Sequence, residues 1–189
     1  MSGGFRLLDE REVHAGHIWT VVVASFEDPD GEPFERDIVR SPGAVGVVPL
    51  RFDAEGSPVV VLVRQYRPAL DRELLEIPAG MRDEEGEDPV GTARRELAEE
   101  CGLAAARFEL LTAFENAAGM TDAITHVYLA LELHGVPSQA HGPEEAHMTV
   151  HAMGLSAAVA EVEAGRITDA KTVIGLLLAD RWLQRADGP

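Results

Sequence analysis

The chain has one cysteine, one lysine and no long uninterrupted apolar run. A lone cysteine, Cys101, excludes an intrachain disulfide framework and any cysteine-based zinc site. No stretch approaches about 18 consecutive apolar residues, and the first ten residues lack the charged and apolar regions of a signal peptide. We therefore expect a cytoplasmic protein that does not associate with membranes.

Basic residues are scarce throughout the chain. It carries 33 acidic residues against 16 basic ones, which gives a formal net charge of −17, and Lys171 is the only lysine. No run of lysine or arginine offsets this charge, so a polyanionic nucleic acid is excluded as a partner. The length of 189 residues and the 46% hydrophobic content are enough for one globular domain with a real core.

The order of apolar and turn-forming segments predicts an α+β fold with a mostly antiparallel sheet. The N-terminal residues 1–40 form a separate hairpin segment in this interpretation, and residues 41–189 form the main domain. The expected strands cover residues 17–26, 34–40, 44–50, 58–68, 73–80, 107–115, 124–133 and 147–153. The expected helices cover residues 89–101, 155–165 and 169–186, the first with Asp88 as N-cap and Gly102 just after its end.

Three glutamates crowd the end of the helix expected at 89–101. Glu96, Glu99 and Glu100 are spaced three and four residues apart, so like charges face one another at about 0.2–0.5 kcal/mol per pair. They also lie at the C-terminal end of the helix, where the helix dipole disfavours anions. Conflicts between local rules are expected mainly at functional sites. The stretch RELAEECGL, residues 95–103, is therefore the first candidate for a site.

Two interpretations of these carboxylates are open from the residues alone. A solvated acidic helix face is the simpler one. A site for a hard cation is the other, because Mg²⁺ and Mn²⁺ prefer carboxylate oxygens and would turn the repulsion into attraction. In that case Arg95 pairs with one carboxylate, and Glu87 approaches from the preceding loop.

The length of the pattern favours the cation site, because residues 80–103 resemble the Nudix box. Six residues separate Gly80 from Glu87, one more than the family pattern has, and every later fixed position agrees. The resemblance implies an α/β/α sandwich with a mixed sheet, and Mg²⁺-dependent hydrolysis of a nucleoside diphosphate linked to another group, with Mn²⁺ as a possible substitute. It also implies roles for five residues. The metal ligands would be Glu96, Glu99, Glu100 and the carbonyl of Ala79, with Glu99 and the orienting Arg95 also counted as catalytic.

Two flanking segments, VLVRQYRP at 61–68 and ELLEIPAG at 73–80, look like the ADP-ribose pyrophosphatase branch of that family. In that branch a catalytic carboxylate lies in a loop after the box, and Glu145 matches its position better than Glu144. The matching substrate-binding candidates are Arg67, Arg64, Glu76 and Trp19. Glu76 is also interpreted as a partner for Arg67 or as a simple strand end.

The resemblance implies hydrolysis of ADP-ribose to AMP and ribose 5-phosphate by a homodimer whose N-terminal hairpins exchange between subunits. Ala118-Gly119 stands where many ADP-ribose hydrolases have proline and glycine. Another nucleoside diphosphate sugar or a dinucleotide therefore stays open as the substrate. A non-catalytic nucleotide sensor is disfavoured, because such proteins usually lose the box glutamates that this chain keeps.

Overall fold

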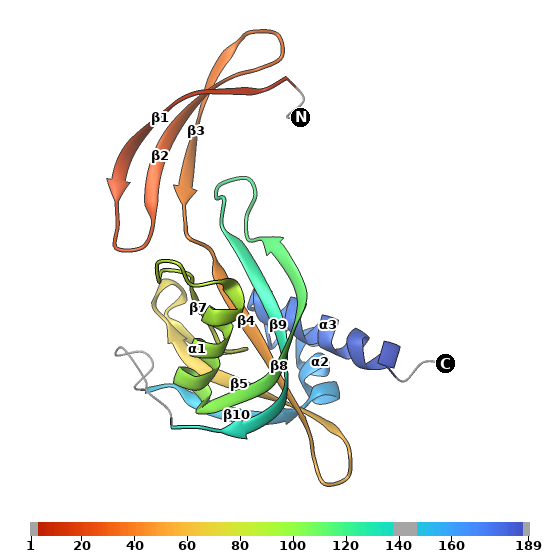
Figure 1. The fold of residues 1–189 in the computed structure, drawn as a ribbon. Coiled ribbons are helices and arrows are strands. Elements are labelled where there is room, and N and C mark those ends of the chain that lie inside the picture. Colours follow the sequence, from red (N-terminus) through yellow and green to blue (C-terminus); the bar gives the residue numbers. More distant parts are fainter. Residues whose placement is uncertain (1–3, 138–146, 187–189) are drawn as a thin grey trace. The chain divides into compact units, whose positions relative to one another are not determined.

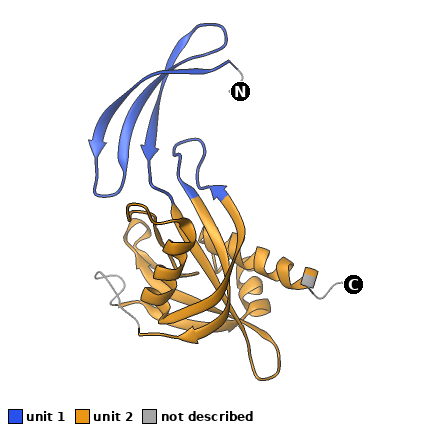
Figure 2. Ribbon diagram, viewed as in Figure 1, with its two compact units in different colours: residues 1–43, 114–124 blue, residues 44–113, 125–189 orange. Residues whose placement is uncertain are grey.

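The computed structural model describes residues 4–137 and 147–186. The chain divides into two compact units (Figure 2). Unit 1 comprises residues 1–43 and 114–124, and unit 2 comprises residues 44–113 and 125–189. Unit 2 contains the box, so the site is built within it.

Unit 1 is built on a three-stranded antiparallel sheet in the order β1-β2-β3. The strands are β1 (Arg6–Ala15), β2 (Thr20–Glu27) and β3 (Pro33–Arg40). The sequence predicted β2 and β3, whereas β1 adds a strand to the expected hairpin. Its sequence, RLLDEREVHA, is exposed at every position. It therefore lacks the apolar alternation by which a half-buried strand is identified.

Unit 2 contains a mixed sheet in the order β10-β5-β4-β9-β8, with β6 paired to β5 and β7 paired to β4 (Figure 1). The central pair β4–β9 is parallel, while β5 runs antiparallel to β4, β6 and β10. The strands are β4 (Ala44–Phe52), β5 (Pro58–Arg67), β6 (Arg72–Glu76), β7 (Ala79–Met81), β8 (Leu103–Glu115), β9 (Ile124–Gly135) and β10 (Thr149–Gly154).

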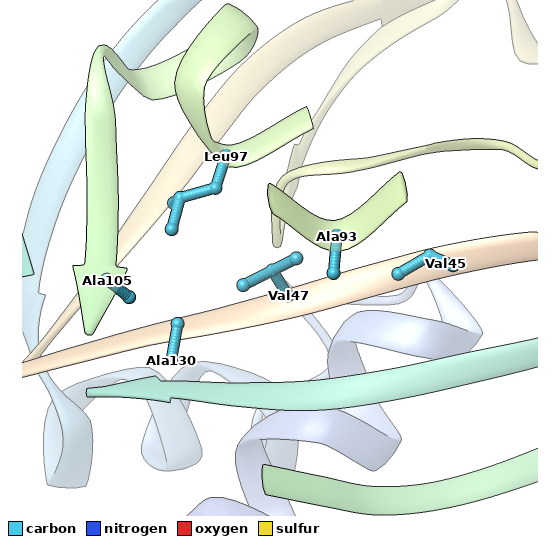
Figure 3. Packing of buried hydrophobic residues seen from close by; sticks show 6 residues of the cluster. All are labelled: Val45, Val47, Ala93, Leu97, Ala105 and Ala130. Atoms are coloured by element: carbon cyan, nitrogen blue, oxygen red, sulfur yellow. The ribbon is translucent and has the colours of Figure 1, made fainter. Parts of the chain in front are cut away.

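Strand β4 is buried on both faces because helices cover each of them. On one face Val45 and Val47 pack with Ala93 and Leu97 of α1 (Pro89–Cys101) (Figure 3). On the other face Val48 lies against α3 (Ala170–Ala186), close to Gly175. The third helix, α2 (Leu155–Glu163), packs on β5 and β10. The expected α/β/α sandwich with a mixed sheet is confirmed.

Within residues 4–137 and 147–186, no helix is long and apolar enough to cross a membrane. The longest described helix, α3, has 17 residues.

The strand expected at 73–80 is divided into β6 and β7. Pro78 has no N–H to donate to a sheet ladder, which favours a break at this point. Its carbonyl oxygen accepts a hydrogen bond of 2.9 Å from the Val47 N–H, and the chain changes partner here from β5 to β4. This change of partner carries Ala79 and Gly80 alongside α1.

Candidate active site

Helix α1 has well-defined ends. The Asp88 side chain accepts a hydrogen bond of 2.7 Å from the Gly91 N–H, and Pro89 follows at the first helical position. Gly102 ends the helix in the left-handed conformation, with φ 61° and ψ 34°, and donates to the Ala98 carbonyl. These caps fix the register of the helix, and so they determine which face carries the glutamates.

The face of α1 that meets β7 buries one glutamate. Glu96 is only 6% exposed. A Cβ atom built on Gly80 would lie 1.9 Å from Glu96 Oε1, so the carboxylate occupies the space where any other residue has a side chain. Burying a carboxylate is costly unless partners compensate it. With the Glu96 carboxylate in this position, no residue larger than glycine fits at the start of the box.

Arg95 provides that compensation and links the box to the preceding loop. Its Nη1 donates to Glu96 Oε1 at 2.6 Å and to Glu99 Oε2 at 3.2 Å. Its Nη2 donates to the Met81 carbonyl and to Glu87 Oε2, both at 3.3 Å. Burial acts to lower the pKa of this guanidinium, but the charges of Glu96 and Glu87 raise the pKa above its ordinary value. The sequence predicts a pair between Arg95 and one carboxylate, and the structure shows pairs with three, Glu87, Glu96 and Glu99.

Glu100 reaches the backbone at the turn between β6 and β7. Its Oε2 accepts a hydrogen bond of 2.9 Å from the Ala79 N–H. Next to this contact lies a cavity of about 480 Å³ that is lined by Ala79, Gly80, Met81, Asp83, Glu84, Arg95, Glu96 and Glu99. The structure thus brings Glu96, Glu99, Glu100 and Ala79 together, and most of them face one polar cavity.

The donor set suits a hard divalent cation, because it offers carboxylate and carbonyl oxygens without sulfur or imidazole. In the described parts of the chain, however, no three His, Cys, Asp or Glu side chains are already arranged to hold a metal. Glu96 and Glu99 engage Arg95, and Glu100 engages the Ala79 N–H. Binding of a cation would therefore replace some of these hydrogen bonds.

A second charged cluster holds Arg67. Its Nε and Nη2 donate to the two oxygens of Glu76 at 2.8 and 2.6 Å. Glu76 is fully buried and also pairs with Lys171, which in turn contacts Asp169 Oδ2 at 2.9 Å. Burial acts to raise the pKa of Glu76, but hydrogen bonds from Arg67 and Lys171 lower it below its ordinary value. Of the three roles predicted for Glu76, the structure shows two: it is the partner of Arg67 and the last residue of β6.

The electrostatic surroundings of Arg67 connect this cluster to the box. The hydrogen bonds to Glu76 raise the pKa of the guanidinium, although burial acts against them. The charges of Glu76, Asp169 and Glu100 add to that increase. Arg67 therefore lies within the electrostatic reach of Glu100, a box carboxylate.

The remaining predicted residues fall in three places. Arg64 is exposed on β5, opposite Thr149 of β10. Trp19 lies in unit 1, in the turn before β2 rather than within the strand, and is 55% exposed. Glu145 and its alternative Glu144 lie outside the described residues.

Lys171 was not singled out for a role by sequence reasoning. The one feature of the sequence that marks Lys171 is that it is the single lysine of the chain, and this feature does not identify its partner. The pairing joins residues 95 positions apart, and it depends on the way α3 packs against the end of β6.

Comparison with known proteins identifies the family of the chain. A family model described as the NUDIX domain matches residues 40–171. The chain is 36% identical over 171 residues to an ADP-ribose pyrophosphatase of Bacillus subtilis (strain 168), with 90% of each chain covered. It is 34% identical over 171 residues to a methanol dehydrogenase activator of Bacillus methanolicus, again with 90% coverage of each. A crystal structure of an ADP compounds hydrolase matches with a TM-score of 0.83, covering 97% of this chain and 96% of the other, at 22% identity.

The chain therefore belongs to the Nudix family, whose members generally use divalent metal ions. It is a Nudix pyrophosphohydrolase that resembles the ADP-ribose pyrophosphatase branch. The structural neighbour shows the shared fold, and the relatives carry the resemblance in sequence.

Proposed function

We propose that this enzyme hydrolyses the pyrophosphate bond of ADP-ribose to AMP and ribose 5-phosphate, with Mg²⁺ as the metal. The oxygen of a water molecule forms a bond to one phosphorus, and the bond from the bridging oxygen to that phosphorus breaks. The bridging oxygen leaves with the other phosphate. One proton of the water stays on the phosphate that gains its oxygen, and the other is released to solvent. The observation that carries the proposal is the buried Glu96 under Gly80, next to the cavity beside α1.

Four oxygen donors would hold the metal in this proposal: the carboxylates of Glu96, Glu99 and Glu100 and the carbonyl of Ala79. The bound cation supplies neutralisation of the diphosphate charge and activation of water. Mn²⁺ has the same ligand preference and is an expected substitute. Arg95 keeps Glu96 and Glu99 on one side of the cavity through its two Nη1 hydrogen bonds.

The proposed substrate contacts come from Arg67, Arg64 and Trp19, and Glu145 is added to the catalytic set. Arg67 binds a phosphate or the ribose, since its side chain is 38% exposed and its guanidinium is oriented by the buried Glu76. Arg64 is a second cation for the diphosphate, and Trp19 stacks on the base. Glu145 is proposed from its sequence position alone as the general base or as an additional metal ligand.

The alternative is the same reaction on another nucleoside diphosphate sugar or on a dinucleotide. A relative named methanol dehydrogenase activator is nearly as similar as the ADP-ribose pyrophosphatase of Bacillus subtilis. Identity at this level therefore favours the reaction more strongly than it favours one substrate.

A substrate panel distinguishes ADP-ribose from the alternative substrates. The enzyme is incubated with ADP-ribose, GDP-mannose, NADH and 8-oxo-dGTP, once with Mg²⁺ and once with EDTA, and released phosphomonoesters are measured. We expect ADP-ribose to be hydrolysed fastest and EDTA to abolish turnover. Faster turnover of another compound contradicts the proposed substrate, and unchanged turnover in EDTA contradicts the metal.

A matched pair of variants tests the site itself. Glu100→Gln keeps the shape of the side chain but removes a proposed metal ligand, and we expect the turnover of every substrate to fall by at least about 100-fold. Glu163→Gln is the control, because Glu163 is an exposed residue of α2. Full activity in Glu100→Gln contradicts the assignment of the metal ligands.

The enzyme is proposed to act as a homodimer that forms through unit 1. Strand β1 is exposed along its whole length and presents Leu7, Leu8 and Val13, each about half exposed. Exposed apolar surface of this kind marks contact sites between proteins. Light scattering coupled to size exclusion should give twice the mass of one chain, 20.4 kDa. A single-chain mass contradicts the dimer.

A further inference from the structure

Four charged side chains form one chain of contacts beside the candidate active site. Arg67 pairs with Glu76, Glu76 pairs with Lys171, and Lys171 pairs with Asp169. Two cations and two anions are present, so the group is neutral as a whole. A neutral buried group avoids the cost of an uncompensated charge.

The four side chains differ in how far they are exposed to solvent. The side chains of Glu76 and Lys171 are 0% and 14% exposed, whereas that of Arg67 is 38% exposed. Asp169 is held in place by Thr172, because its Oδ2 accepts from the backbone N–H and the hydroxyl of Thr172 at 3.0 and 2.6 Å. With Asp169 at 20%, Arg67 is therefore the most exposed member of the group.

The Glu76 carboxylate is divided between two cations. Nε and Nη2 of Arg67 are used for Glu76, and Nη1 takes no part in that pair. The Glu76 Oε2 atom that accepts from Arg67 Nη2 also accepts from Lys171 Nζ. Part of the negative charge that would cancel Arg67 is thus offset by Lys171.

We infer that Lys171 is a positioning residue for substrate binding: by sharing Glu76 it keeps the Arg67 guanidinium oriented and leaves it positive toward an anionic group of the substrate. This inference rests on the proposed role of Arg67 in binding a diphosphate. Without Lys171 the group carries one excess negative charge, and Arg67 is neutralised by Glu76. A substrate with a negative diphosphate is then attracted less strongly.

The group also borders the segment that carries the box glycine. Thr172 Oγ1 accepts a hydrogen bond of 3.0 Å from the Ile77 N–H, directly after Glu76 and three residues before Gly80. Loss of packing in this region would therefore lower kcat as well as raise KM. An electrostatic effect through Arg67 would change KM alone.

The test compares substitutions that differ in charge. Lys171→Met removes the charge and shortens the side chain by one atom, and we expect KM to rise about tenfold with kcat within about twofold. Lys171→Arg should restore KM to within about threefold of the wild-type value. Asp169→Asn removes an anion instead, so KM should stay the same or fall. Arg166→Met is the control, because Arg166 forms an exposed ion pair with Glu161.

Double variants show whether Lys171 acts through Arg67. Lys171→Met should leave KM unchanged when Arg67→Met is already present. Persistence of the tenfold effect in that background overturns the inference, and so does an equal rise of KM in Lys171→Met and Asp169→Asn. If Lys171→Met does not fold, Asp169→Asn decides alone: a raised KM contradicts the inference.

All values of KM are measured on the diphosphate that the wild-type enzyme hydrolyses fastest. A preference for a compound other than ADP-ribose therefore refutes the proposed substrate and leaves the comparison between variants intact.

A second readout is independent of turnover. Because Lys171 is the only lysine, labelling with ¹⁵N-lysine gives a single side-chain ammonium signal in NMR. The signal should persist in the wild type and vanish in Glu76→Gln, and its absence from the wild type overturns the pairing.

Discussion

At Gly80 the backbone passes so close to the Glu96 carboxylate that a methyl group does not fit. Gly80→Ala must move either β7 or the carboxylate, because the added Cβ would lie 1.9 Å from Glu96 Oε1. A displacement of about 1 Å at a catalytic group costs about 100-fold in rate. We therefore expect kcat/KM to fall by at least about 100-fold, as measured by steady-state kinetics.

The matched control for this substitution is Gly135→Ala. A Cβ atom at Gly135 meets no atom within 4 Å, and its backbone is not in the left-handed region. Its activity should equal that of the wild type. Normal activity in Gly80→Ala would show that the close approach to Glu96 has no functional importance.

The charge of the Glu76 carboxylate contributes to the stability of the fold. Its pKa is lowered in the folded protein from the ordinary value of 4.5, so its charge stabilises the fold above pH 4.5. That contribution is lost as the pH falls through the lowered folded value. Glu76→Gln should cost about 3 kcal/mol at pH 7, because it leaves Arg67 and Lys171 without their shared anion.

Urea unfolding of the wild type and Glu76→Gln at several pH values measures this effect. The difference in unfolding free energy should be full at pH 7 and should shrink as the pH is lowered below 4.5. Glu163→Gln serves as control and should stay within about 0.5 kcal/mol of the wild type at pH 7. If the difference in unfolding free energy between the wild type and Glu76→Gln stays constant from neutral to acidic pH, the charge of Glu76 does not stabilise the fold.

The two clusters of the site differ in how far the sequence could predict them. Glu96, Glu99 and Glu100 lie within one helical turn, so their spacing already places them together. The pair Glu76–Lys171 joins the end of β6 to α3 across 95 residues. No local periodicity encodes such a contact, because it depends on the packing of two distant elements.

At the scale of elements, α3 contains a glycine that helix propensity disfavours. Gly175→Ala should gain about 1 kcal/mol from propensity alone. The new Cβ would, however, lie 2.9 Å from Val48 Cγ2 and 3.2 Å from Ile77 Cδ1. Overpacking in a core costs about 1–3 kcal/mol. We expect a net loss of about 1 kcal/mol in unfolding free energy, as measured by urea titration.

A double variant separates packing from propensity at this position. Combined with Val48→Ala, Gly175→Ala should cost less than it does alone, because the nearest methyl group is gone. If Gly175→Ala stabilises the protein, propensity outweighs packing and the close contact between α3 and β4 is looser than described.

Elements were predictable where an apolar pattern accompanied them. Helix α1 is bounded by Asp88 and Gly102, and its observed limits match the expected residues 89–101. Strand β1 has no buried face, so its sequence carries no signal of period two. The break at Ile77–Pro78 was missed because apolar residues on both sides continue the same pattern.

At the scale of the whole molecule, the sheet of unit 2 holds the site together from both sides. Helix α1 and its glutamates cover one face of β4, and α3 with Lys171 covers the other. The segment from Glu76 to Gly80 runs between the two clusters, with Ile77 bonded to α3 and Ala79 bonded to Glu100 of α1. Five consecutive residues, Glu76 to Gly80, thus contact both Arg67, the proposed substrate-binding cation, and the box carboxylates.

Binding of the metal should therefore be visible in the stability of the fold, without any substrate. A ligand at about 100 times its Kd adds about 2.7 kcal/mol to the unfolding free energy. For a chain of this length, that increase corresponds to a rise in Tm of roughly 5–10 °C. The net charge of −17 also attracts cations nonspecifically, so the variants must separate the two effects. Mg²⁺ should raise the Tm of the wild type and of Glu163→Gln, EDTA should reverse the rise, and Glu100→Gln should lose most of it. An equal rise in all three proteins, measured by differential scanning calorimetry, would mean that Mg²⁺ screens surface charge and that the box carboxylates are not its ligands.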